Sequence, residues 1–414
     1  MSLPTQTDLI IVGGGMVGVT LALLMAQRMP EKQVLLLESM RFPALPENEP
    51  LPYTAGFDAR NTALSRRTVQ AFTDLGLWPQ LQPHAVPIHE IHVSDRGHFG
   101  FSRLNAAEER VESFGQVIEN AWLGVVLLAA LKQCPSVVIA DGVEVKQLTT
   151  DSQKASVRCQ TALGEMTISA PLVVAADGTH SQCRDWLGLS AQWHDYQQTA
   201  LVTTVATSLP HEHRAFERFT ASGPIALLPL PDFADGAKQT RRSLVWALST
   251  AEAERIKALD DKAFMLELQA AFGRRAGRFQ RVGQRHAYPL QLMVAPKQTL
   301  SRAVIMGNAA HSLHPVAGQG FNLCLRDALV LVERLAQAGT NQQDWGDATL
   351  LASYEASRQS DQSQIIRFSD SLVRGFSSDA PALVLLRNIG LVGFDLLPGA
   401  KPTLARYAMG LDHV

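Results

Sequence analysis

A short apolar run followed by closely spaced glycines constrains the fold of the N-terminal part most strongly. Residues 8–12 read Asp-Leu-Ile-Ile-Val, which is typical of a short buried strand. Residues 19–29 are almost wholly apolar and predict a helix. Between the two runs stands a Gly-x-Gly-x-x-Gly pattern, formed by Gly13, Gly15 and Gly18. The pattern predicts a tight strand-to-helix turn, through which an anionic group can approach the backbone at a helix N-terminus.

An acidic residue at a suitable distance strengthens this interpretation. A second apolar run, residues 33–37, ends at Glu38, 20 positions after Gly18. In Rossmann-like dinucleotide sites a carboxylate at this spacing binds ribose hydroxyls, while the pyrophosphate lies on the helix N-terminus. We therefore predict a dinucleotide site. The alternative is a glycine-rich turn that only packs a helix on a strand, with Glu38 as a solvated strand end.

Two further strand-to-loop passages carry glycines. Residues 303–306 predict a buried strand and residues 321–336 a long apolar helix, and the loop between them contains Gly307, Asn308, Pro315, Gly318 and Gly320. Such a helix start offers free N–H groups and a positive dipole end to an anion. Earlier, Asp177 and Gly178 follow the apolar run 172–176, at the kind of strand end where α/β sheets bind ligands. The alternative for Asp-Gly is a plain turn.

Composition excludes several classes of function. The chain has 414 residues, 46% of them hydrophobic, and a net charge of -2, so it lacks the basic field expected of a nucleic-acid-binding protein. The four cysteines are scattered and predict reduced thiols in a cytoplasmic protein, and no metal site is expected. The chain enters its first strand without a signal-like segment, and no apolar run reaches the ~18 residues that a membrane-spanning helix needs.

The order of predicted elements indicates an α/β fold with two interleaved domains. The first, Rossmann-like, takes residues 1–84, 115–187 and 288–344; the second, a mixed or antiparallel β-sheet domain for the substrate, takes 85–114 and 188–287. Short strands at residues 136–168 suggest an inserted meander, and residues 288–290 are expected to return the chain to the first domain. Residues 345–414 predict a helical region. Its apolar patch at 380–397 favours a helical cap, with a membrane-facing or partner-binding surface as the alternative.

Taken together, these motifs resemble those of the FAD-dependent aromatic-ring hydroxylases over nearly the whole chain. The stretches GFDARNTALS, HVSDRGHFGF, VAADGTHS, AFERFT and NAAHSLHPVAGQGFN are similar to the ubiquinone-biosynthesis branch, in particular to enzymes acting on 2-polyprenyl-6-methoxyphenol. The resemblance implies bound FAD, NAD(P)H as a transient reductant, O2, and a polyprenylated phenol as substrate. It leaves open contacts with other proteins of ubiquinone biosynthesis and with a membrane surface at the periphery of a cytoplasmic protein.

The resemblance also implies roles for individual residues. The expected cofactor-binding residues are Gly13, Gly15, Gly18, Glu38, Arg60, Asp177, Gly178, Gly307, Asn308, Gly318, Gly320, Phe321 and Asn322. Asn308 departs from the family, which has an acid there; an amide can still accept a hydrogen bond from a hydroxyl. The candidates for the catalytic side are Pro315, whose carbonyl is expected to face the substrate ring, His311 and His314 for proton transfer, and Gln319. The alternative for both histidines is that they only pack the loop.

Two other functions fit parts of the pattern. One is a different flavin enzyme of the same fold, such as a prenyl-chain reductase or a halogenase, although the Trp-x-Trp-x-Ile-Pro signature of flavin halogenases is absent. The other is a flavin-binding scaffold subunit without turnover, which only Asn308 supports. Oxygen consumption that depends on NAD(P)H and is stimulated by a phenol separates an enzyme from a scaffold.

Overall fold

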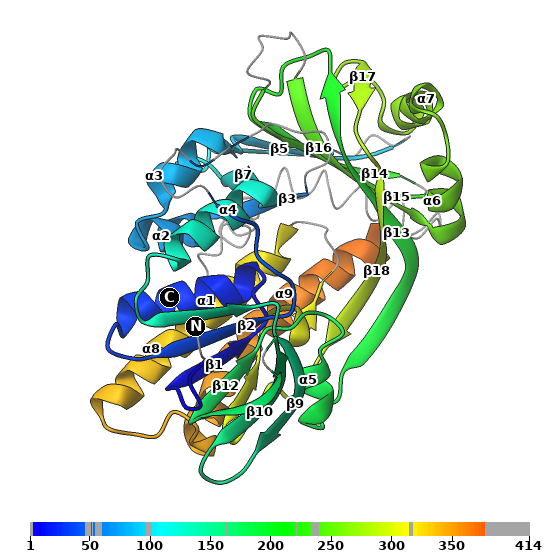
Figure 1. Cartoon of the computed structure of the whole chain (residues 1–414). Helices are drawn as coiled ribbons and strands as arrows, with labels where there is room; N and C mark the ends of the chain where they lie inside the picture. Colours follow the sequence, from blue (N-terminus) through cyan, green and yellow to red (C-terminus); the bar gives the residue numbers. More distant parts are fainter. Residues whose placement is uncertain are drawn as a thin grey trace.

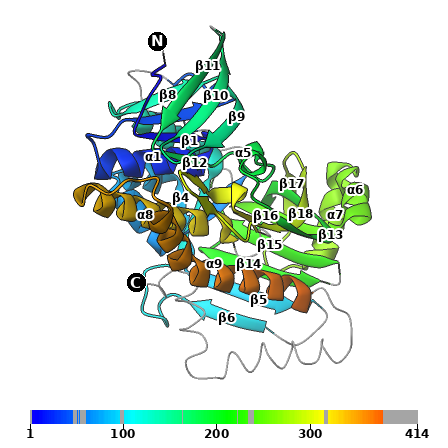
Figure 2. The same cartoon turned by 90° about the horizontal axis from the view of Figure 1, so that it is seen from below.

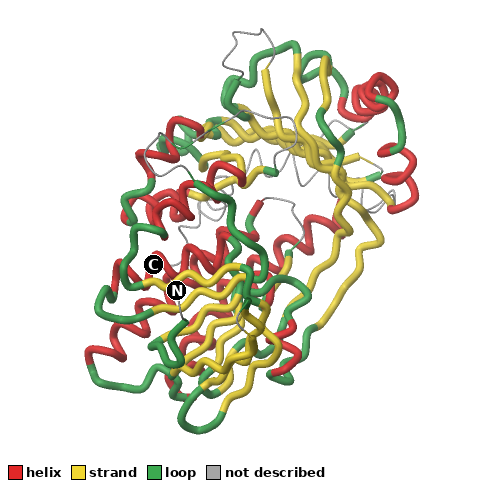
Figure 3. The backbone as a smooth tube through the Cα atoms, in the orientation of Figure 1, coloured by secondary structure: helices red, strands yellow, loops and turns green. Residues whose placement is uncertain are grey.

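Two large sheets organise the chain (Figure 1). The computed structural model describes residues 3–45, 51, 53, 60–96, 101–162, 164–220, 222–232, 240–313 and 318–376, with side chains up to residue 371. One large sheet is mainly parallel and is called the main sheet below. The other is mainly antiparallel and is called the second sheet. Figure 3 shows the strands gathered in these two groups, with helices beside each.

The main sheet is built from short apolar strands. Within the described residues it has six strands in the order β19 (Thr299–Leu300), β20 (Ala303–Ile305), β12 (Leu172–Ala175), β1 (Leu9–Val12), β2 (Val34–Glu38) and β8 (Val137–Asp141). All neighbours pair in parallel except β19 with β20. Residues of β1 are buried on both faces, which is why its sequence is a continuous apolar run instead of an alternating one.

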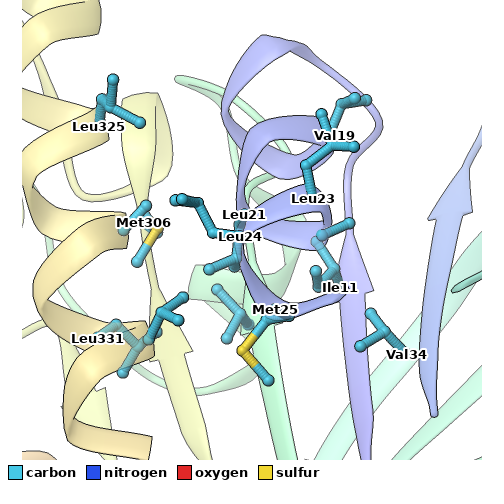
Figure 4. Close-up of a cluster of buried hydrophobic side chains, with 14 of the residues drawn as sticks. Ile11, Val19, Leu21, Leu23, Leu24, Met25, Val34, Met306, Leu325 and Leu331 are labelled. Carbon is cyan, nitrogen blue, oxygen red and sulfur yellow. The ribbon is translucent and has the colours of Figure 1, made fainter. Parts of the chain in front are cut away.

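Helices cover one face of the main sheet. They are α1 (Met16–Arg28), α4 (Asn120–Leu131) and α8 (Gly320–Thr340), and α1 packs against both others. Figure 4 shows part of the resulting core, in which Ile11 and Val34 of the sheet meet Leu21 of α1 and Leu331 of α8. Each such fully buried side chain contributes about 1.5–3 kcal/mol to folding. This core fixes the starts of α1 and α8 relative to the strand ends beside them.

Smaller elements cover the remaining sides of the main sheet. The opposite face packs on an antiparallel meander, β9 (Glu144–Thr150), β10 (Ala155–Thr161) and β11 (Gly164–Ala170), and on α5 (Gln182–Trp186). A further small sheet comprises β3 (Asn61–Ser65), β7 (Gly115–Glu119) and β4 (Ala85–Pro87). Next to it lie α2 (Arg66–Asp74), α3 (Trp78–Leu81) and the short 3-10 turn η1 (Gln82–His84).

The second sheet joins strands from distant parts of the chain. Its described strands run β21 (His311–Ser312), β18 (His286–Val294), β13 (Gln192–Thr207), β16 (Thr240–Ser249), β15 (Gly223–Pro229), β14 (Arg214–Thr220), β5 (Glu90–Asp95) and β6 (Phe101–Asn105), with β17 (Phe279–Val282) also paired to β13. In this sheet β5 and β6 pair antiparallel. Two helices, α6 (Thr250–Lys257) and α7 (Asp261–Phe272), cover its outer face (Figure 1).

A long helix connects the two sheets. α9 (Ala348–Phe376) packs on α8 and β19 and also contacts β15 of the second sheet (Figure 2). Near its far end, Tyr196 of β13 donates a hydrogen bond to Asp370 of α9 at 2.9 Å. None of the described helices is both long and apolar enough to cross a membrane. The apolar patch predicted at residues 380–397 lies outside the described residues.

Two sequence-based expectations were wrong in detail. The strand predicted at 136–140 as part of the meander is β8, which pairs with β2 at the edge of the main sheet. Residues 288–290 do not return the chain to the main sheet, because β18 still pairs with β13 of the second sheet and β19 is the first strand back. Both errors concern which sheet a strand joins, which a strand's own apolar pattern does not encode.

Candidate functional site

Four adjacent strands of the main sheet end in residues singled out from the sequence. In the order β20, β12, β1 and β2, the strands are followed or closed by Gly307, Asp177, Gly13 and Glu38. Parallel neighbours place their carboxyl ends at one edge, where open α/β sheets bind ligands. The structure thus brings together the three glycine motifs and the acid, which lie up to 294 positions apart in the chain (13 to 307).

The glycines after β1 have two different reasons to be glycine. Gly13 has a φ of 107°, and a Cβ there would collide with the carbonyl oxygen of Ala176. A Cβ on Gly18 would collide with the carbonyl oxygen of Gly13. Gly15, in contrast, has a φ of -68°, which any residue adopts, and nothing lies within 4 Å of the position of its Cβ. Gly15 therefore keeps open the space at the N-terminus of α1, as a pyrophosphate lying there requires.

Glu38 lies beside this open space. Its Oε2 accepts a hydrogen bond from the Gly14 N–H at 2.6 Å, and its Oε1 accepts one from the Met40 N–H at 2.8 Å. These bonds fix the carboxylate at the carboxyl end of β2, next to the glycine turn. A carboxylate oxygen can accept more than one hydrogen bond, so Glu38 can still accept from a ribose hydroxyl.

The start of α8 repeats the pattern of α1. Gly320 is its first residue, and nothing lies within 4 Å of where its Cβ would be. The Leu323 N–H donates to the carbonyl of Gln319 at 3.0 Å, and Gln319 itself is buried. The three amides before Leu323, those of Gly320, Phe321 and Asn322, are first-turn N–H groups without a partner in their own helix. They suit an electron-rich ring edge or an anion.

The side chain of Asn322 holds this helix start in place. Its Oδ1 accepts hydrogen bonds from the Ser65 N–H at 2.9 Å and the Thr68 hydroxyl at 2.8 Å. Its Nδ2 donates to the carbonyls of Ala63 at 2.9 Å and Gly318 at 3.1 Å. All four hydrogen-bonding positions of the amide are thus used inside the protein. Asn322 can therefore bind a cofactor through its backbone only.

Gly307 and Asn308 lie near the start of α1. Gly307 has a φ of 66°, and a Cβ there would stand 3.3 Å from Cγ1 of Val17 in the first turn of α1. Asn308, next in the short 3-10 turn η2 (Gly307–Ala309), is exposed. An exposed amide near a helix N-terminus can accept from or donate to a hydroxyl-rich ligand without opposing the charge of a phosphate.

Asp177 has a structural task within its own turn. Its two carboxylate oxygens accept hydrogen bonds from the Ser181 hydroxyl at 2.5 Å and the Cys183 N–H at 3.1 Å, which fixes the start of α5. Gly178 has a φ of 91° and nothing within 4 Å of its Cβ position. The turn therefore needs glycine for its backbone conformation, and it leaves open space beside β12 and β1.

Arg60 lies between the small sheet and the second sheet. It precedes β3, is exposed, and places its guanidinium 5.6 Å from the centre of the Tyr288 ring of β18. Such a cation–π contact leaves the guanidinium donors directed outward. The contact also shows that the side of β18 carrying Tyr288 is turned towards the elements around the main sheet.

His311 belongs to a buried chain of charges between α8 and α9. Its Nε2 lies 2.7 Å from Oδ2 of Asp327, whose Oδ1 accepts from Nε of Arg358 at 2.6 Å. Arg358 also pairs with Asp361, which accepts from Nε of Arg326 at 2.8 Å. All five side chains are at least nine-tenths buried. We call these five residues the α8–α9 charge cluster.

The cluster keeps His311 protonated. Burial acts against the charge, but contacts with Cys324 and Asp327 outweigh it and raise the pKa of His311 to about 10. For Asp327, burial is likewise outweighed by His311 and Arg358, which hold its pKa below the usual value. A protonated, buried and paired histidine is suited to holding β21 against α8 and poorly suited to accepting a proton near pH 7.

Some predicted residues cannot be placed and others were missed. His314 and Pro315 lie outside the described residues. Asp327 was missed, although its position between Leu323 and Leu331 on the apolar stripe of α8 was a signal, because an acid in that phase needs a buried partner. Within the described part of the chain, no group of three or more His, Cys, Asp or Glu side chains could hold a metal ion.

Comparisons with known proteins agree with this geometry. Residues 6–369 match the FAD binding domain family. The chain is 34% identical to ubiquinone hydroxylase UbiL of Rhodospirillum rubrum, over 97% of this chain and 89% of that protein. It is 29% identical to 3-demethoxyubiquinol 3-hydroxylase of Escherichia coli, over 98% of this chain and 99% of that protein.

The fold is also that of a solved hydroxylase. Para-nitrophenol 4-monooxygenase PnpA of Pseudomonas putida superposes with a TM-score of 0.76 at 18% identity, covering 99% of this chain and 100% of that one. Since the Gly15 and Gly320 helix starts and Glu38 provide the open backbone positions and the acid that FAD needs, the site and the comparisons agree on the cofactor. The chain belongs to the FAD binding domain family and is an FAD-dependent aromatic-ring monooxygenase.

Proposed function

We propose that this protein hydroxylates the ring of a polyprenylated phenol in ubiquinone biosynthesis, with NAD(P)H and O2 as co-substrates. A 2-polyprenyl-6-methoxyphenol is the substrate that we infer from the sequence resemblance. The names of relatives that act in the same pathway support the proposal. The structural observation that carries it is the side of the second sheet that bears Tyr288, which we call the inner face.

The inner face is apolar over several strands. The paired residues of successive strands put Ala226, Val245 and Val202 in one row on this side, with Leu228 next to it. A small charged phenol does not need such a surface, whereas a prenyl tail does. Each methylene or methyl group that the protein removes from water contributes about 0.8 kcal/mol, so even a partly covered tail outweighs a few polar ring contacts.

The cofactor assignments follow the strand ends described above. When bound and reduced by NAD(P)H, FAD supplies the activation of O2 that the reaction needs. We propose that Gly13, Gly15 and Gly18 admit its pyrophosphate and that Glu38 binds the adenosine ribose. Arg60, Asp177, Gly178, Gly307 and Asn308 would flank the remainder of the dinucleotide, and Gly318, Gly320, Phe321 and Asn322 the flavin ring edge.

On the substrate side, we assign His311 a positioning role. Its ion pair with Asp327 fixes β21 relative to α8. His314 and Pro315 lie in the sequence between these two elements. His314, Pro315 and Gln319 remain the predicted substrate-side residues. We keep the predicted division into domains as part of the proposal, with the second domain extended through β18, so that residues 85–114 and 188–294 supply most of the substrate surface.

The tail also bears on partners. A prenylated phenol resides in membranes, so a peripheral contact with a membrane surface or with a lipid-binding protein of the same pathway fits this substrate. Such a peripheral contact needs no membrane-spanning helix, and none of the described helices could form one.

The decisive experiment compares two substrates. A polyprenylated methoxyphenol and the same phenol without its tail are assayed in one detergent, with the hydroxylated product measured by mass spectrometry. We expect a much higher kcat/KM for the prenylated substrate, and the fragment masses give the ring position. Equal efficiency on both, or a preference for a small charged phenol such as a hydroxybenzoate, would contradict the substrate. Absence of phenol-stimulated NAD(P)H oxidation would point to a scaffold.

A further inference from the structure

An acidic residue stands in the apolar row of the inner face. Glu217 is in β14, where it pairs with Ala226 of the antiparallel strand β15 and with Val93 of the parallel strand β5. Paired residues of neighbouring strands lie on the same side of a sheet. Glu217 therefore continues the row of Val202, Val245 and Ala226 across the sheet.

Contacts of its neighbours show that this side is the inner one. Ala215, two positions before Glu217 and hence on the same side, packs in one core cluster with Val117 of the small sheet. Phe216, on the opposite side, packs with Trp246 and Phe264 in the core under α6 and α7. The Glu217 side chain thus leaves the sheet towards the elements that carry the FAD site.

The Glu217 side chain is partly buried, and one oxygen of its carboxylate is buried without a partner. Its Oε1 is closed to solvent, and no described residue donates a hydrogen bond to it. Three fully buried acids, in contrast, have a cation: Glu119 pairs with Arg241 at 2.6 Å, and Asp327 and Asp361 lie in the α8–α9 charge cluster. An unpaired buried carboxylate costs stability, so its presence needs a reason other than folding.

Burial alone sets the acidity of this group. It raises the pKa of Glu217 to about 7, without a contribution from a neighbouring charge. Among the charged residues of the elements packed around it, Asp95 of β5 shares its side of the sheet and Asp370 of α9 accepts from Tyr196. Arg218 points to the opposite side and donates to Ser94. A carboxylate with a pKa near 7 is a stronger base than an ordinary one, and about half of it is still ionised at neutral pH.

We propose that Glu217 is the residue that binds the phenol hydroxyl of the substrate and accepts its proton. The proposal rests on the phenolic substrate inferred above. The O–H bond of the phenol breaks, its proton moves to a Glu217 carboxylate oxygen, and the electron pair stays on the phenol oxygen, which enriches the ring for attack. The ring carbon that gains the oxygen gives up its hydrogen as a proton, which is taken up by the group that delivered the oxygen, and the ring becomes aromatic again. The carboxylic acid then returns its own proton to the phenol oxygen. No further reactant is needed.

The test separates the proton from other contributions. Wild type, Glu217→Gln and Glu217→Asp are compared on the prenylated phenol and on its methyl ether, which has no hydroxyl proton to give. We expect kcat/KM for the phenol to fall by about a hundredfold in Glu217→Gln and to recover in part in Glu217→Asp. The affinity for the methyl ether, measured by its effect on flavin absorbance, should not differ between wild type and Glu217→Gln.

A pH profile provides a readout that a structural role would not move. In wild type, kcat/KM should rise with pH through a pKa near 7, and this rise should be absent in Glu217→Gln. Glu90→Gln is the matched control, because Glu90 lies on β5, on the opposite side of the sheet, and pairs with Arg214. That variant should keep the wild-type profile.

The two proposals fail in different ways. If wild type hydroxylates another phenol but not a prenylated one, the substrate is wrong, and the same variants measured on the accepted phenol still test Glu217. If Glu217→Gln retains its flavin and stays within about twofold of wild type on the phenol with an unchanged pH profile, the role of Glu217 is wrong. Equal losses on the phenol and in methyl ether affinity would also overturn it, because they indicate a packing role.

Discussion

Two buried regions of this molecule treat charge in opposite ways. In the α8–α9 charge cluster, three cations and two carboxylates from β21, α8 and α9 are joined into one chain of ion pairs. On the inner face of the second sheet, Glu217 stands in a row of apolar residues, and its Oε1 has no hydrogen-bond partner. The first region already contains the partners of its charges, so it can only build structure. In the second region the acid has no partner in the protein, so a ligand can supply one. In the same way, a ligand can fill the open spaces at Gly15 and Gly320.

The largest effect should follow from removing the centre of the cluster. Asp327→Asn leaves His311 and Arg358 buried without their shared counter-charge, so we expect the free energy of unfolding to fall by about 3–5 kcal/mol. Denaturant unfolding of the FAD-saturated protein, followed by circular dichroism, measures it. Glu333→Gln, which breaks an exposed ion pair with Arg28, is the control and should change stability by less than about 1 kcal/mol.

The cluster also predicts a dependence on alkaline pH. Because the folded state raises the pKa of His311 from 6.5 to about 10, its stabilising contribution is complete below pH 6.5 and is lost as pH rises through about 10. The difference between wild type and Asp327→Asn should therefore shrink over that range. A difference that stays constant from pH 6 to 10 would show that His311 is not protonated in the folded protein.

Removing the lone acid should have the opposite sign. The folded state raises the pKa of Glu217 from 4.5 to about 7, so its carboxyl group favours folding less and less as pH rises through this range. Glu217→Gln should then raise the free energy of unfolding by up to ~3 kcal/mol above pH 7 and hardly change it near pH 4.5. The same unfolding assay at both pH values measures this. Destabilisation at both would mean that Glu217 has a stabilising partner.

The open space at the start of α1 predicts a smaller effect on binding that leaves the fold intact. The side chain added by Gly15→Val would contact no protein atom, but it would occupy the space that the pyrophosphate must approach. We therefore expect FAD affinity to fall by at least tenfold, about 1.4 kcal/mol. Gly124→Val is the control, since Gly124 also has nothing within 4 Å of its Cβ position and lies in α4. Titration of both apoproteins with FAD measures the difference. A Gly15→Val protein with a full complement of yellow flavin would contradict the assignment.

The smallest effect is expected at Asn308. The side chain is exposed at the strand end, and an amide and a carboxylate can accept the same hydrogen bond, so Asn308→Asp should change FAD affinity by no more than about tenfold, 1.4 kcal/mol. The same titration decides. A loss of FAD affinity beyond a hundredfold would show that the site depends on a neutral amide at position 308.

The sequence by itself determined the parts of the site that depend on local chain geometry. The strand, the glycine turn, the helix and Glu38 could be predicted because glycine spacing and apolar periodicity act within about 30 residues of chain. The second strand-to-helix passage, β20 followed by α8, could be predicted for the same reason. The two uses of glycine could not be separated, because Gly13 and Gly15 differ in backbone conformation and in what lies across from them, and the sequence shows neither.

Only the tertiary structure decided which groups meet. From the sequence, His311 was a candidate for proton transfer. In the structure it is a buried cation, because Asp327 of α8 pairs with it and with Arg358 of α9. Glu217 lies in phase with Ala215 and Phe219, but whether that side of β14 is buried, and against what, depends on β5, β15 and the small sheet. Pairing and burial are long-range properties, and they set the charge state of a side chain, which its identity alone does not.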